Sequence, residues 1–102
     1  MSPHPLDDLI AHLRRHSLRT DGPFVLRSGA LSSWYLDARQ TSYSGDGGRL
    51  VGEAVLAVLD EEAEALGGMT MGADPVAVAT AVVAAIQGRA LRSFSVRKDR
   101  KD

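Results

Sequence analysis

The chain has 102 residues, of which 44% are hydrophobic and 25% are charged, and its formal net charge is -1. These are the values of an ordinary globular domain, and a single domain of this length is expected to bury about 65% of its extended surface. The near-neutral charge argues against a nucleic-acid partner, which would require a marked basic excess. Because cysteine is absent, disulfides, thiolate metal sites and cysteine nucleophiles are excluded.

The sequence also argues against a membrane partner. The N-terminus lacks the charged-then-apolar pattern of a signal peptide. The longest apolar run, residues 76–86, is about half the length that a membrane-spanning helix needs. We therefore expect a soluble chain located in the cytoplasm.

The first predicted element is an amphipathic helix of about three turns, which ends before the turn signal at residues 20–23. His12 and His16 lie four residues apart on it and could share a metal ion. However, the residues between them are Leu-Arg-Arg, and no third ligand is evident. The sequence therefore favours a solvated helix edge for both histidines. The apolar face of this helix consists of Leu6, Leu9, Ile10 and Leu13.

Residues 24–39 are the most informative stretch. A short apolar run ends in the cation Arg27 and is followed by a Ser-Gly turn signal. Residues 34–39 then alternate between apolar and polar, which predicts a half-buried strand. An ordinary amphipathic hairpin, in which the charged residues pair with neighbours, and a functional strand face are both compatible with this pattern. The second face carries Tyr35, Asp37 and Arg39.

A loop and a long helix are predicted next. Residues 40–48 are polar and glycine-rich, and Ser44 or Asp46 is placed to cap the helix that follows. The loop lacks a Walker lysine and a preceding buried strand, so a plain loop is favoured over a phosphate loop. An apolar stripe over residues 50–59 predicts the helix. The acids of residues 60–64 are expected on a solvated face of its C-terminal half.

The last part of the chain predicts a strand–helix–strand unit. Residues 67–72 read as a buried strand, and Asp74 and Pro75 form a strong helix start with the carboxylate as N-cap. The helix covers residues 76–87, and residues 90–96 form the second strand of a parallel crossover. Backbone amides at the helix start are a natural anion site, unless Asp74 fills it. The sequence leaves both alternatives open.

The stretch 24–39 resembles the N-terminal signature of the orotate phosphoribosyltransferases. Ten positions fit in one ungapped window, which is far more specific than a lone glycine motif. The resemblance continues to the end of the chain, where Arg97, Lys98 and Lys101 match the opening of the family's mobile catalytic loop. Taken alone, that charge run would usually be a solvated tail. The ten positions are Phe24, Leu26, Arg27, Ser28, Gly29, Ser32, Trp34, Tyr35, Asp37 and Arg39.

The resemblance implies an α/β fold of the type I phosphoribosyltransferase kind, with a parallel sheet flanked by helices and an N-terminal helix and hood hairpin. It implies one truncated domain over residues 1–102. Residues 1–43 would form the helix and the hood, and residues 44–102 the first part of the α/β core. The C-terminal half of the fold, with its ribose-binding Asp-Asp loop, is expected to be absent. The turn at 72–75 is shorter than in many members and lacks a lysine that elsewhere helps to hold the phosphoribosyl donor.

The activity implied by the resemblance is transfer of the phosphoribosyl group from phosphoribosyl pyrophosphate to orotate, in de novo pyrimidine biosynthesis. The products are orotidine 5′-monophosphate and pyrophosphate. Mg²⁺ is implied as a cofactor held by the substrate rather than by protein ligands, and the family's dimers imply a homodimer with shared sites.

The resemblance also assigns site residues. Lys101 is the predicted catalytic residue, whereas Asp37 and Arg39 are expected to be mainly structural. The residues predicted to bind orotate or phosphoribosyl pyrophosphate are Arg27, Trp34, Tyr35, Arg97, Lys98 and Lys101.

Two alternatives stand beside this interpretation. The chain could be a non-catalytic, nucleotide-binding regulatory module on the same scaffold, or a fragment without a stable fold. A two-stranded parallel unit needs neighbouring strands and cover on both faces. We therefore expect the 102-residue chain to be incomplete for catalysis on its own.

Overall fold

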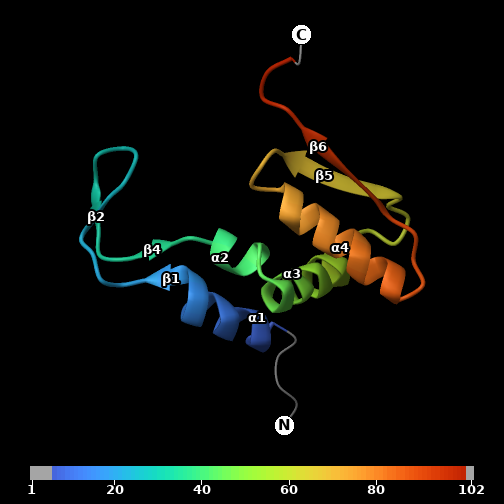
Figure 1. The fold of residues 1–102 in the computed structure, drawn as a ribbon, viewed down its shortest axis with the longest axis horizontal. Helices are drawn as coiled ribbons and strands as arrows, with labels where there is room; N and C mark the ends of the chain where they lie inside the picture. Colours follow the sequence, from blue (N-terminus) through green and yellow to red (C-terminus); the bar gives the residue numbers. More distant parts are fainter. Residues whose placement is uncertain (1–5, 101–102) are drawn as a thin grey trace.

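The computed structural model describes residues 6–100 and has the expected α/β architecture (Figure 1). It is flat, with extents of 54 × 44 × 21 Å. An arm, residues 18–36, projects to one side of a body that comprises residues 45–96. The helices are α1 (Asp7–His12), the π-helical turn η1 (Leu13–Ser17), α2 (Arg39–Ser42), α3 (Gly45–Val58) and α4 (Asp74–Ile86). The strands are β1 (Leu18–Arg19), β2 (Phe24–Val25), β3 (Leu31–Ser32), β4 (Tyr35–Leu36), β5 (Ala65–Met69) and β6 (Arg92–Val96).

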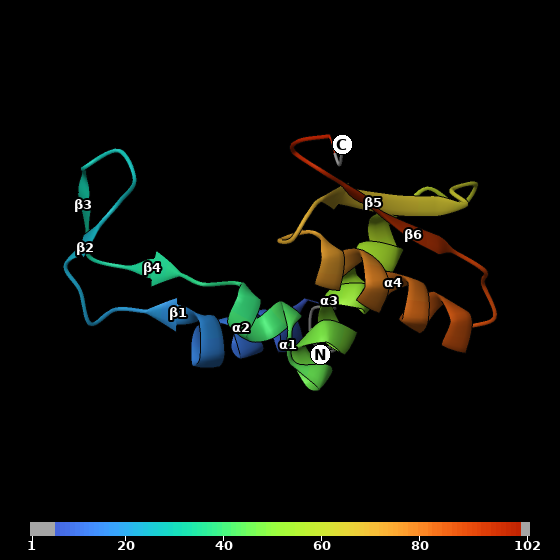
Figure 2. The same cartoon turned by 45° about the horizontal axis from the view of Figure 1, so that its top comes forward.

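The body contains the predicted strand–helix–strand unit. Strands β5 and β6 pair in parallel, with Met69 opposite Val96 at the carboxyl end. Helix α4 connects the two strands and packs against both, and α3 packs alongside α4 (Figure 2). The first strand was predicted two residues too late. It covers 65–69 and alternates between exposed and partly buried residues, while residues 70–72 form a turn.

Helices α3 and α4 pack closely together in the body. The buried residues of α4 are small or β-branched, which lets the two helices approach closely. A Cβ atom added at Gly52 of α3 would lie 2.8 Å from the carbonyl oxygen of Ala79, so only glycine fits there. The opposite side of α4 remains exposed at Val78, Val82 and Ile86. Its buried residues are Ala77, Thr80, Val83 and Ala84.

The start of α4 differs from the sequence prediction. Asp74 is the first helical residue, and no side chain caps the helix. The Asp74 carboxylate instead accepts hydrogen bonds from the Ser95 hydroxyl, at 2.6 Å, and from the Thr70 hydroxyl. These two bonds lower the pKa of Asp74. Asp74 therefore links the start of α4 by hydrogen bonds to β6 and to the residue after β5, and it does not cap the helix.

Helix α3 begins as predicted but ends earlier. The Ser44 hydroxyl caps it by accepting a hydrogen bond of 3.0 Å from the Gly47 amide. The helix ends at Val58, so the acids of 60–64 lie beyond it and not on its C-terminal half. Arg89 fixes this connection by donating to the carbonyl oxygens of Asp60, at 2.7 Å, and Ala63, at 3.0 Å.

The arm consists of short antiparallel pairs. Strand β1 pairs with β4, and β2 pairs with β3 to form the predicted hairpin. Gly29 occupies the hairpin turn with φ of +89°, a conformation that favours glycine. The strand predicted over residues 34–39 is wrong beyond Leu36, because the chain turns at Asp37 and enters α2. No residue of the arm is buried.

A buried polar network joins α1, α2 and α3, and it overturns the predicted solvated edge at His12. The His12 side chain is only 8% exposed. Its Nδ1 lies 3.0 Å from the Thr41 hydroxyl, and its Nε2 lies 3.2 Å from a carboxylate oxygen of Asp46. The Ser17 hydroxyl lies 2.6 Å from that of Thr41, and both residues are fully buried. The network holds α2 against its neighbours.

Residues 6–100 contain neither a cluster of metal ligands nor a membrane-spanning helix. No group of three or more His, Asp or Glu side chains lies close enough together to hold a metal ion. In the same part of the chain, no helix is both long enough and apolar enough to cross a membrane.

Candidate active-site cleft

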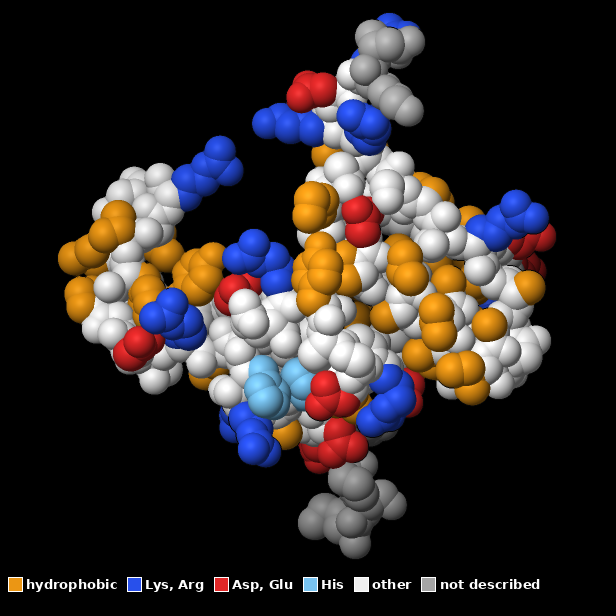
Figure 3. All heavy atoms as spheres, viewed as in Figure 1, with side chains coloured by type: hydrophobic (Ala, Val, Ile, Leu, Met, Phe, Trp, Pro, Cys, Tyr) orange, Lys and Arg blue, Asp and Glu red, His pale blue; other side chains and the backbone are white. Residues whose placement is uncertain are grey.

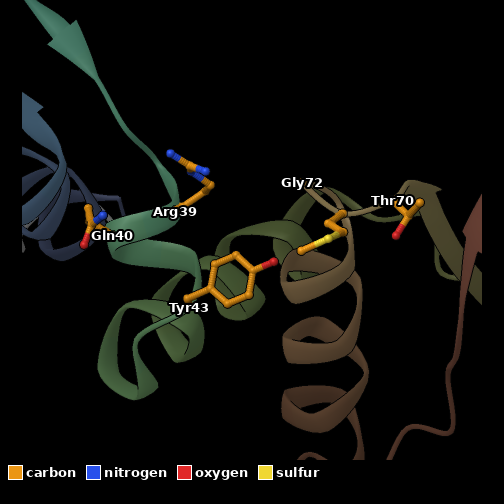
Figure 4. Close-up of a pocket in the computed structure, with 6 residues that line it drawn as sticks. Arg39, Gln40, Tyr43, Thr70 and Gly72 are labelled. Carbon is orange, nitrogen blue, oxygen red and sulfur yellow. The ribbon is translucent and has the colours of Figure 1, made fainter. Parts of the chain in front are cut away.

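A cleft of about 790 Å³ lies between α2 and the turn that joins β5 to α4 (Figure 4). One wall belongs to α2 and the residue that follows it, and the other belongs to the 70–72 turn. In Figure 4 the Tyr43 ring points across the gap towards the second wall. The residues that line the cleft are Arg39, Gln40, Tyr43, Thr70, Met71 and Gly72.

The position of the 70–72 turn follows from the parallel sheet. Parallel strands bring their carboxyl ends to one edge, and α/β proteins bind ligands at that edge. The Thr70 amide donates a hydrogen bond of 2.9 Å to the carbonyl oxygen of Val96. Arg97 and Lys98 follow Val96 directly, so these exposed cations leave the sheet at the same edge as the turn.

Asp37 organises the wall that α2 contributes. Its carboxylate accepts hydrogen bonds from Arg39 Nε at 2.9 Å and Arg39 Nη2 at 3.3 Å, and from the Gln40 amide at 3.1 Å. The Arg39 and Gln40 hydrogen bonds lower the pKa of Asp37 to about 2, so its carboxylate is ionised at neutral pH. The Asp37 side chain is 18% exposed, whereas that of Arg39 is 69% exposed. A fixed anion thus holds an accessible cation on the cleft wall.

The predicted arm residues do not line this cleft. Arg27 lies in the exposed turn of the β2–β3 hairpin. Trp34 is 57% exposed and Tyr35 is 44% exposed, so neither is a core residue. Tyr35 contacts Phe24, with 5.9 Å between the ring centroids. Their predicted roles in substrate binding remain predictions.

Cations nevertheless gather around one hollow of the surface. Figure 3 shows an open space between the arm and the body, with Lys and Arg side chains on the arm tip, near α2 and on the segment after β6. Arg27 is the cation in residues 24–32, and Arg97 and Lys98 are in the segment after β6. Lys101, the predicted catalytic residue, lies outside the described residues. Arg27, Arg97 and Lys98 are all exposed, and among the described residues no hydrogen bond or ion pair joins them.

Sequence reasoning missed most of the cleft. The sequence pattern predicts a polar loop at Gln40 and Tyr43 and a buried strand at Thr70 and Met71. The one nearby signal was the predicted helix start at Asp74 and Pro75, whose backbone amides form a natural anion site. Arg39 had been expected to be mainly structural, and its ion pair with Asp37 is present.

Comparison with solved structures first defines the class of protein. The fold matches *Mycobacterium tuberculosis* orotate phosphoribosyltransferase in complex with Fe(III) dicitrate, with a TM-score of 0.81 and 32% identity, over 95% of this chain and 56% of that one. It also matches a phosphoribosyltransferase from *Corynebacterium diphtheriae*, with a TM-score of 0.75 and 26% identity, over 95% of this chain and 52% of that one. The chain therefore has a phosphoribosyltransferase fold.

Comparison with known sequences makes the likeness more specific. No protein-family model matches the chain. Orotate phosphoribosyltransferase from *Streptomyces coelicolor* is 43% identical over 81 residues, covering 78% of this chain and 44% of that protein. The *Aquifex aeolicus* enzyme of the same name is 38% identical over 92 residues, covering 87% of this chain and 50% of that protein. The chain is accordingly homologous to the orotate phosphoribosyltransferases, and it spans about half the length of these relatives.

Proposed function

We propose that the protein transfers the phosphoribosyl group of phosphoribosyl pyrophosphate to orotate, yielding orotidine 5′-monophosphate and pyrophosphate. This places it in de novo pyrimidine biosynthesis in the cytoplasm. The observation that carries the proposal is the cleft at the carboxyl edge of β5 and β6, in a chain homologous to orotate phosphoribosyltransferases over most of its length. A *Mycobacterium tuberculosis* enzyme with this fold, 30% identical to the chain, has been solved with phosphoribosyl pyrophosphate.

The charge distribution suits this chemistry. The anomeric carbon passes through an oxocarbenium-like state while the highly charged pyrophosphate departs, and fixed cations stabilise such a leaving group. Arg97 and Lys98 leave the sheet beside the 70–72 turn, which supports a role for them in binding anionic oxygens there. Lys101 would extend the same run of cations. The reaction needs no dedicated acid or base from these residues.

The arm supplies groups suited to orotate. Orotate is a planar ring that carries a carboxylate, and an arginine fork binds planar anions through two parallel hydrogen bonds. Arg27 is exposed at the tip of the arm, and the rings of Trp34 and Tyr35 are accessible for contact with a flat ligand. We propose that the arm closes on the cleft when orotate binds.

The residues of the cleft do not themselves form a Mg²⁺ site. Mg²⁺ prefers carboxylates together with substrate phosphates, and no carboxylate lines the cleft. The proposed cofactor would therefore arrive bound to the phosphates of the substrate. We also propose a homodimer with shared sites, in keeping with the exposed apolar side of α4.

The direct test is turnover. Because the 102 residues alone are expected to be incomplete for catalysis, orotate, phosphoribosyl pyrophosphate and Mg²⁺ are mixed with the natural protein, with any sequence that adjoins these residues, and orotidine 5′-monophosphate is measured by chromatography. Formation of that product in proportion to protein concentration is expected and would exclude a purely binding module. Tight binding of both substrates without product would contradict the proposed activity and favour the regulatory module.

A further inference from the structure

The Arg39 guanidinium is only partly used by its partner. A guanidinium has five N–H donors. Asp37 takes two of them, one on Nε and one on Nη2. Among the described residues, the Arg39 guanidinium makes no other hydrogen bond. Three donors therefore remain, two on Nη1 and one on Nη2, and they form a second edge with two parallel N–H groups.

The remaining edge is oriented before any ligand arrives. Asp37 is partly buried and is ionised at neutral pH, so its two hydrogen bonds fix the plane of the guanidinium in the cleft wall. Asp37 also holds the neighbouring Gln40 side chain through its amide nitrogen. The cost of ordering a long side chain is thus partly met before binding, which increases the affinity for a ligand.

We propose that Arg39 is an oxyanion-binding residue of the cleft, which holds a carboxylate or phosphate group through its Nη1–Nη2 edge, and that Asp37 is its positioning residue. The inference rests on the proposed function, which supplies two sources of such a group: the carboxylate of orotate and the phosphates of the donor. Both are planar or tetrahedral oxyanions that two parallel N–H groups can bind.

The chain offers a matched control for this site. Arg19 is paired with Asp21 in the same way, two residues apart, with Nε–Oδ1 at 3.3 Å and Nη2–Oδ2 at 3.1 Å. Arg19 is also exposed, but it lies in the arm and does not line the cleft. Replacing Arg19 removes the same charge and the same kind of ion pair as replacing Arg39, at a different place.

The test is isothermal titration of the 102-residue chain with orotate and, separately, with inorganic pyrophosphate. Arg39→Gln should weaken binding of one probe by about tenfold or more, because a charge-assisted bidentate contact is lost. Arg39→Lys, which keeps the charge without the fork, should restore only part of this loss, and Arg19→Gln should bind like the wild type. Thermal melts of every variant show whether it folds.

The positioning role of Asp37 has its own readout. Asp37→Asn should weaken binding of the same probe when Arg39 is present. It should cause no further loss in the Arg39→Gln background, because its effect passes through Arg39. Equal losses in both backgrounds would show that Asp37 acts only on the structure and would overturn its assignment.

The outcomes separate the subsite from the proposed function. Weaker orotate binding in Arg39→Gln identifies the carboxylate as the ligand group, and weaker pyrophosphate binding identifies the phosphate; either supports the subsite. If the wild type binds both probes, and Arg39→Gln and Arg39→Lys bind them with the same affinity, the subsite is overturned and the proposed function stands. Pyrophosphate binding through Arg39 without any orotate binding would keep the subsite and contradict the proposed function. A wild type that binds neither probe contradicts both.

Discussion

The arm and the body of this protein are built in opposite ways. The arm has four strands of two residues each and no buried residue. The body has a close-packed contact between α3 and α4, where even the Cβ of an alanine would clash at Gly52. Segments with few buried contacts open most easily, whereas packed segments set the global stability. We therefore expect substitutions in the arm to change ligand handling and substitutions in the body to change stability.

The largest expected effect is on the stability of the body. Gly52→Val places a side chain within 2.8 Å of a backbone carbonyl that cannot move away without separating α3 from α4. Overpacking of this kind costs about 3 kcal/mol in the free energy of unfolding. The matched control is Gly45→Val on the same helix, where no atom lies within 4 Å of the added Cβ. Chemical denaturation of both variants measures the difference, and equal losses would show that the helix contact is not the cause.

The buried polar network should give a smaller loss of stability. Thr41→Val keeps the shape of the side chain but removes the hydroxyl that meets His12 and Ser17. Leaving buried polar groups without a partner costs about 2 kcal/mol. Thr20→Val makes the same change at an exposed position and should be nearly neutral. A thermal melt that ranks the two variants equally would contradict the role assigned to the network.

Substitutions in the arm should change turnover more than they change stability. Arg27→Ala is expected to lower turnover of orotate about tenfold, the effect of losing one charge-assisted contact. The free energy of unfolding should change by less than about 0.5 kcal/mol, as is usual for exposed residues. Arg14→Ala removes an exposed cation from η1 and should leave turnover unchanged. A large loss of stability with normal turnover would reverse the assignment of Arg27 to the substrate.

The smallest expected effect is the pH dependence of the Asp37–Arg39 pair. Asp37 has a pKa of about 2 in the folded chain, below the value of about 3.9 for a free aspartate. Its ionised form therefore stabilises the folded state above about pH 4, and this contribution is lost as the pH falls through 2. Carboxyl-carbon NMR should follow this titration.

Arg39→Gln should raise the Asp37 titration midpoint towards the ordinary value, because the Arg39 hydrogen bond is the largest cause of the lowered pKa. Arg19→Gln should leave the midpoint near 2, its value in the wild type. An unchanged Asp37 midpoint in Arg39→Gln would contradict the pairing of Asp37 with Arg39.

The long regular elements could be predicted because they carry their own periodicity. The helical apolar stripes predicted α1, α3 and α4. The helix-start signal at Pro75 and the helix-stop signal at Gly88 predicted both ends of α4 to within two residues. The parallel pairing of β5 and β6 followed from the strand–helix–strand order. The resemblance to orotate phosphoribosyltransferases, read from residues 24–39, is confirmed by the relatives and the fold.

The parts that failed depend on contacts between distant segments. Alternation at 34–39 suggested a strand, but Asp37 binds the side chains of Arg39 and Gln40 where the chain turns into α2. His12 looked solvated because its partner Thr41 is 29 residues away. The cleft was missed for the same reason, since its two walls come from 39–43 and 70–72 and meet only in the folded chain.

The most direct measurement is a titration of the isotopically labelled chain with orotate, and then with pyrophosphate, followed by NMR of the backbone amides. We predict that the amides of Gln40, Thr70 and Gly72 shift progressively and more than those of the exposed side of α4. Such shifts would place the ligand between α2 and the β5–α4 turn. Saturable binding with shifts confined to α4, or to the Arg19–Asp21 region of the arm, would show that the cleft is not the substrate site.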